Sequence, residues 1–90
     1  MRIRQSLKLR HVGSHFFVVN PDNGHIDLTD IYTLNHEAAF LWESFHGQDF
    51  TAEMMARRLC EAYEVTYEHA LDDVTGMLRL WREYGIIETE

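Results

Sequence analysis

The first third of the chain alternates between apolar and polar residues and is rich in β-branched and aromatic residues, which is typical of β-strands. Two runs, 7–12 and 15–20, are separated by Gly13-Ser14, and the second offers apolar residues to both faces. Glycine at the first of two loop positions fits a type II′ hairpin turn. The resulting register pairs Leu9 with Val18 and His11 with Phe16 on one face, and Lys8 with Val19 and Arg10 with Phe17 on the other.

A further strand follows this hairpin before the pattern becomes helical. The segment Pro21-Asp22-Asn23-Gly24 predicts a turn, and the apolar run Ile31–Leu34 predicts a third strand. The short piece Ile26–Leu28 is left undecided.

Three helices are predicted after residue 34, because apolar residues now recur every three or four positions. Their N-caps are Asn35, Thr51 and Thr66, and Gly47 and Gly85 end the first and the third. The inward faces are Ala38, Leu41, Trp42 and Phe45; Met55, Leu59, Ala62 and Tyr63; and Ala70, Leu71, Val74, Met77, Leu78 and Trp81. Ile86-Ile87 is expected to fold back on the core. Strands followed by helices with short connections predict a single α+β domain over residues 1–90.

Composition supports a globular, cytoplasmic protein. Apolar residues make up 46% of the 90 positions, with one proline, and no apolar run is long enough for a membrane span. The lone cysteine, Cys60, excludes an internal disulfide and a cysteine-based zinc site. We expect it to be a half-buried, space-filling thiol.

The charge distribution argues against nucleic acid as a partner. The formal net charge is −7, although half of the basic side chains lie in the first ten residues, as Arg2, Arg4, Lys8 and Arg10. The last two helices resemble a helix-turn-helix in their order. However, the third helix carries four acidic side chains against two basic ones. Most of the acidic ones lie in its first half, where the phosphates of a bound DNA would be closest.

The chain shows no pattern of catalytic or metal-binding residues. The histidines do not form a helical pair with a nearby glutamate, as a zinc hydrolase requires; they are His11, His15, His25, His36, His46 and His69. Asp72 and Asp73 point in directions about 100° apart on a helix, so they cannot share one substrate atom. We therefore expect neither an enzyme nor a bound cofactor.

The third helix is apolar over an unusually wide arc, about 180° from Leu80 through Trp81 to Leu71. Either a small domain wraps its longest helix deeply, or one flank lines a groove for a partner peptide. The two candidate flanks are Leu71 and Leu78, bordered by Thr75 and Arg82, or Leu80 and Tyr84.

The segment 34–43 begins with Leu34-Asn35 and continues through small residues to the pair Leu41-Trp42. This order resembles the start of the first helix in the PqqD-like proteins, and the resemblance extends from about Leu7 to Ile87. Other positions fall at similar spacings: Gly47, Thr51, Leu59, Tyr63, Val65, Ala70, Asp73, Val74, Leu78 and Gly85-Ile86-Ile87. Ala38 stands where relatives often have glycine.

The resemblance implies a winged-helix-like domain that binds the leader segment of a ribosomally made precursor peptide. The leader would be added as a strand beside the third strand and would be presented to a modifying enzyme of the radical SAM type. With one cysteine, this chain would hold no iron–sulfur cluster itself. The expected contacts are Ile31, Tyr32, Thr33 and Leu34 on the edge, and Leu71, Thr75, Leu78 and Arg82 on the groove wall.

An alternative is an interaction domain that binds another protein or itself. Phe17 and Val19 on the outer face of the sheet would suit a homodimer, whose interface pairs one patch with its own copy.

Overall fold

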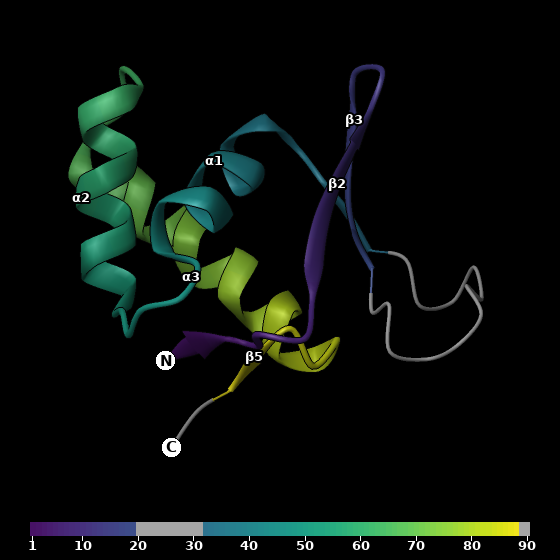
Figure 1. The fold of residues 1–90 in the computed structure, drawn as a ribbon. Coiled ribbons are helices and arrows are strands. Elements are labelled where there is room, and N and C mark those ends of the chain that lie inside the picture. Colours follow the sequence, from purple (N-terminus) through teal and green to yellow (C-terminus); the bar gives the residue numbers. More distant parts are fainter. Residues whose placement is uncertain (20–31, 89–90) are drawn as a thin grey trace.

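The computed structural model describes residues 1–19 and 32–88. Figure 1 shows the helices packed together on one side and a long hairpin standing beside them. The elements in order are β1 (Arg2–Ile3), β2 (Lys8–Val12), β3 (His15–Val19), β4 (Tyr32–Leu34), α1 (His36–Phe45), α2 (Ala52–Ala62), α3 (Tyr67–Glu83) and β5 (Ile87–Glu88). A three-stranded antiparallel sheet followed by three helices confirms the predicted α+β, winged-helix-like fold.

The β2–β3 hairpin has the register that the sequence predicts. Leu9 lies opposite Val18 and Lys8 opposite Val19, and the two remaining predicted pairs are also present. Gly13 has a φ of +61°, and no described non-glycine residue has positive φ, so Ser14 does not. Positive φ at the first loop position alone is the type II′ pattern, which confirms the predicted turn.

The strand β4 lies at one edge of the sheet, in the order β2-β3-β4. It pairs antiparallel with β3, with Leu34 opposite Phe16 and Thr33 opposite Phe17. The predicted third strand is therefore confirmed over 32–34. Its first residue, Ile31, lies outside the described residues, as do the predicted turn at 21–24 and the segment Ile26–Leu28.

All three helices begin at the predicted caps. The side chains of Asn35, Thr51 and Thr66 accept hydrogen bonds from backbone N–H groups three residues later, at 2.8, 3.2 and 3.2 Å. These bonds satisfy donors that a helix start leaves unpaired. Gly47 and Gly85 follow the ends of α1 and α3 with φ of +88° and +73°, a backbone region in which glycine is favoured.

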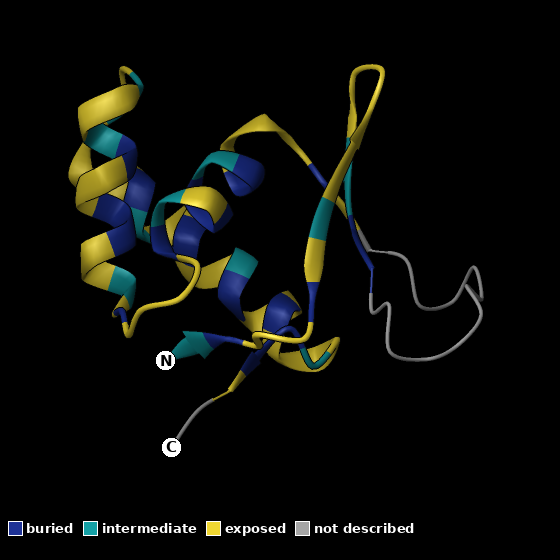
Figure 2. Ribbon diagram, in the orientation of Figure 1, coloured by how far each residue is buried: buried dark blue, intermediate teal, exposed yellow. Residues whose placement is uncertain are grey.

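The core lies among the helices and the β1–β5 pair, and Val18 and Leu34 of the three-stranded sheet add to it. Figure 2 shows the buried colour concentrated on the helices, while most of β2 is exposed. The predicted inward residues of α1 are all buried, and the fully enclosed Trp81 of α3 meets Trp42 edge-to-face at 5.9 Å. In α2 the prediction for Ala62 is wrong, because this residue is exposed at the last position of the helix, while Ala56 is fully buried.

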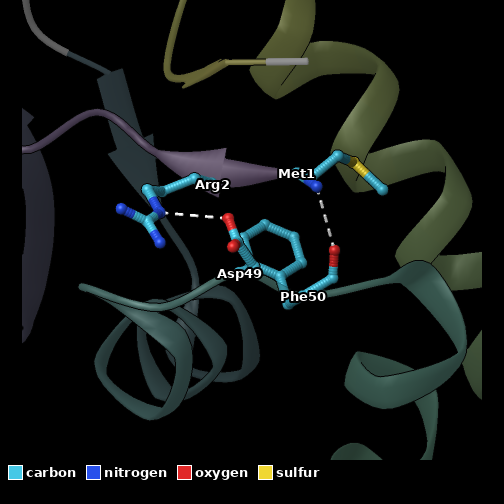
Figure 3. Close-up of polar contacts among 4 residues, drawn as sticks. All are labelled: Met1, Arg2, Asp49 and Phe50. Atoms are coloured by element: carbon cyan, nitrogen blue, oxygen red, sulfur yellow. Dashed lines mark hydrogen bonds and ion pairs between the residues drawn. The ribbon is translucent and has the colours of Figure 1, made fainter. Parts of the chain in front are cut away.

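The N-terminal segment forms a small second sheet that the sequence analysis did not anticipate. β1 pairs antiparallel with β5, which places Ile3 opposite Ile87 and confirms that Ile86-Ile87 folds back on the core. Figure 3 shows the other contacts of this segment. The Met1 amine donates to the Phe50 carbonyl at 3.1 Å, the Phe50 N–H donates to the Met1 carbonyl at 2.9 Å, and Arg2 pairs with Asp49 at 3.1 Å.

Candidate functional site

The edge of β4 is open along the described part of the chain. Its partner on one side is β3, and no other described strand pairs with it. Leu34 points into the core and is 4% exposed, whereas Thr33 on the opposite face is exposed. An unpaired strand edge offers backbone N–H and C=O groups to an incoming extended segment.

A pocket begins immediately after this strand and runs between the three helices. Its volume is about 330 Å³, near the lower limit of small-molecule pockets. Three elements form it: the start of α1, the end of α2 with the loop that follows, and the middle of α3. Its lining residues are Asn35, Glu37, Ala38, Leu41, Leu59, Tyr63, Val65, Asp73, Val74 and Met77, and we call it the anchor pocket.

The anchor pocket is apolar at its floor and polar at its rim. Ala38, Leu41, Leu59 and Val74 are buried, and Tyr63, Val65 and Met77 are half-buried. The polar lining residues Asn35, Glu37 and Asp73 are exposed. The pocket can therefore enclose apolar groups while its rim faces solvent.

The predicted groove wall on α3 lies on a different side of the helix from the anchor pocket. Thr75, Leu78 and Arg82 line a second pocket together with Met1, Ala52 and Arg79. Leu78 is 4% exposed, Leu71 is half-buried, and the Thr75 hydroxyl donates to the Leu71 carbonyl at 2.7 Å. This flank thus faces the N-terminal segment and the start of α2.

The alternative flank of α3 is the one that continues from the anchor pocket. At about 100° per residue, Met77, Leu80 and Tyr84 fall on one border of the buried stripe. Leu80 is 44% exposed and Tyr84 is 61% exposed, so this border presents apolar surface. Sequence spacing shows both flanks, but only the packing of α1 and α2 against α3 distinguishes them.

Apart from these surfaces, chemistry in the described residues would require metal ligands, buried polar groups or reactive side chains. In the ranges 1–19 and 32–88, no three His, Cys, Asp or Glu side chains gather as metal ligands, and no polar or charged residue is buried. Cys60 is a half-buried free thiol, as predicted. The Asp73 carboxylate lies 3.5 Å from the imidazole of His69, and both side chains are exposed. No described helix is both long and apolar enough to cross a bilayer.

The homodimer alternative rests on Phe17 and Val19 of the outer face of the sheet. Val19 is only 6% exposed and Phe17 is half-buried within the chain itself.

Comparisons with known proteins give one family and one solved fold. The family model described as "Coenzyme PQQ synthesis protein D (PqqD)" matches residues 16–87. The solved structure "TbiB1 in Complex with the TbiA(beta) Leader Peptide" superposes with a TM-score of 0.75 at 16% identity. The match covers 100% of this chain and 98% of that one, so the two share a fold over their whole length. A search of curated protein sequences gave no significant match.

Proposed function

Since the chain belongs to the PqqD family, we propose that it is a non-catalytic module that binds the leader segment of a ribosomally made precursor peptide. One observation carries the proposal: among the described strands β4 pairs only with β3, and Asn35, the residue that follows β4, lines a pocket with an apolar floor. The likeness in fold to TbiB1, which was solved with a leader peptide, supports it.

Strand addition to β4 would supply affinity without depending on the sequence of the peptide. Backbone N–H and C=O groups of the leader would pair with the outer edge of β4, residues 32–34, in the manner of β-augmentation. The sheet would grow from three strands to four on that side. Selectivity must then come from side-chain pockets beside the strand.

For the groove wall we propose the flank of α3 that carries Met77, Leu80 and Tyr84. It continues from the anchor pocket, which starts at Asn35, the residue after β4. The flank with Thr75, Leu78 and Arg82, which the sequence suggested, faces Met1 and Ala52 instead. We therefore expect a leader that lies along β4 to contact the flank with Met77, Leu80 and Tyr84.

The partner that acts on the peptide would be a separate enzyme. We propose a modifying enzyme of the radical SAM type in the cytoplasm, because family members of this kind often work beside one. The single cysteine of this chain cannot hold an iron–sulfur cluster, so the partner would supply it. The module would hold the leader while the rest of the precursor reaches that enzyme.

Backbone amide exchange tests the proposal directly. Short peptides encoded by genes next to the one for this protein would be added to isotope-labelled protein. Amide hydrogen exchange would then be followed residue by residue by NMR. We expect slower exchange for Tyr32–Leu34, together with chemical-shift changes along α3 at Met77 and Leu80. The amides of β2, at the opposite edge of the sheet, serve as the internal control. Protection at β2 alone, or binding of no such peptide, would refute the proposal.

A further inference from the structure

The anchor pocket combines an apolar floor with acidic groups at its rim. Glu37 comes from the first turn of α1 and Asp73 from the middle of α3, and both line the pocket. The described lining includes no lysine or arginine. The polar part of the rim is therefore negative on two sides.

Cations nearby do not neutralise this rim. Arg58 on α2 lies over the ring of Phe40, 5.0 Å from its centroid, and pairs with Glu61 at 3.1 Å, and it does not line the pocket. His69 approaches Asp73 at 3.5 Å, but both side chains are more than half exposed, so the pair is weak and open to exchange.

We infer that the anchor pocket takes a long basic side chain, lysine or arginine, from the bound peptide; this inference rests on the proposed function. Such a side chain has an apolar stem that would lie along the half-buried Tyr63, Val65 and Met77. Its cationic head would reach the carboxylates of Glu37 and Asp73 at the rim. A glutamate or aspartate would be repelled there, and a purely aliphatic side chain would gain nothing from the two carboxylates.

The protein's overall charge favours the same class of peptide. A chain of net charge −7 attracts cationic segments from a distance, and the attraction weakens as salt screens it. The acidic rim would then fix where along the peptide the positive charge is placed.

A small probe separates the pocket from the strand edge. Labelled protein would be titrated with 4-phenylbutylammonium and with its neutral counterpart, 4-phenylbutanol, and amide shifts would be recorded. We expect the cation to shift amides around Asn35–Ala38, Val65 and Asp73–Met77. It should bind roughly three- to tenfold more tightly than the alcohol, the amount that two exposed ion pairs provide. Addition of 0.5 M NaCl should remove the difference.

The double variant Glu37→Gln/Asp73→Asn should abolish the preference for the cation. The matched control is Glu43→Gln/Asp72→Asn, which removes the same charge from the same two helices at exposed positions that do not line the pocket. The control should keep the preference. Unfolding temperatures of both double variants establish that each is folded. Equal binding of cation and alcohol, binding of neither, or an unchanged preference in the Glu37→Gln/Asp73→Asn variant would overturn the inference.

A leader peptide that binds at β4 provides the second readout. Replacing each of its lysines and arginines by glutamine should weaken binding at one position, and only with the wild-type rim. If the peptide protects β4 but no replacement matters, the basic-side-chain inference fails and the proposed function stands. If no peptide protects β4, the proposed function itself fails, whatever the small probes do.

Discussion

Asn35 connects the two parts of the candidate site. It follows the last residue of β4, caps α1 through a 2.8 Å bond to the Ala38 N–H, and lines the anchor pocket. Its side chain therefore stabilises the start of α1 directly after the strand. The position of Glu37 at the pocket rim depends on this cap, since that residue lies in the first turn.

Replacing Asn35 by alanine should lower the free energy of unfolding by about 1 kcal/mol, the usual loss for an N-cap. Asn35→Asp should keep the stability, because aspartate also accepts the N–H bond and suits the positive end of the helix. Urea unfolding followed by circular dichroism measures both. An equal loss in the two variants would show that the side chain acts by some means other than capping.

At the scale of elements, β1 is short but holds together three parts of the fold. It pairs with β5, and its neighbour Met1 exchanges two backbone hydrogen bonds with Phe50 in the segment between α1 and α2, one of which is drawn in Figure 3. Ile3 is fully buried, whereas the ion pair of Arg2 with Asp49 is largely in solvent. The stabilisation from this segment should therefore come from its apolar side chain.

We expect Ile3→Ala to lower the free energy of unfolding by about 2–5 kcal/mol, because it leaves a cavity in the core. Arg2→Ala, one position away, should lower it by no more than about 1 kcal/mol, the limit for an exposed ion pair. Denaturant midpoints of the two variants give the comparison. Similar small losses would mean that β1 is not part of the cooperative fold.

The elements that could be predicted from the sequence are those whose signals lie in neighbouring residues. The hairpin register and the helix starts depend on neighbouring residues, and Gly13, Asn35, Thr51 and Thr66 carry those signals locally. The pairing of β1 with β5 joins residues at opposite ends of the chain. A two-residue strand with one buried isoleucine is too short for its alternation to reveal a partner at the other end of the chain.

Of the candidate site, the edge strand could be predicted from the sequence, but the flank of α3 beside the pocket could not. The edge strand over 32–34 follows from its apolar run and from the cap after it. Which flank of α3 lies beside the anchor pocket depends on how α1 and α2 cross that helix. Helical spacing alone leaves Leu80 and Tyr84 equivalent to Leu71 and Leu78. That choice required the pocket-lining residues Asp73, Val74 and Met77.

At the scale of the whole molecule, a domain of 90 residues has a small margin of stability, and the candidate site spans both of its layers. A peptide added to β4 would contact the sheet, and its side chains would contact the helices through the anchor pocket. Both contacts exist only in the folded protein. Binding and global unfolding must therefore be linked.

A leader peptide that protects β4 should raise the thermal midpoint of unfolding. At a free concentration of a hundred times its Kd, it adds about 2.7 kcal/mol to the stability of the folded state. For a domain of this size each kcal/mol moves the midpoint by about 4–8 °C, so we expect a rise of roughly 10–20 °C. Scanning calorimetry with the peptide and with a permuted sequence of the same composition measures it. The permuted peptide has the same net charge and should raise the midpoint far less, because charge alone does not form the added strand. A peptide that protects β4 at saturation and yet leaves the midpoint unchanged would mean that it binds the unfolded chain equally well, and strand addition to a preformed edge would then be ruled out.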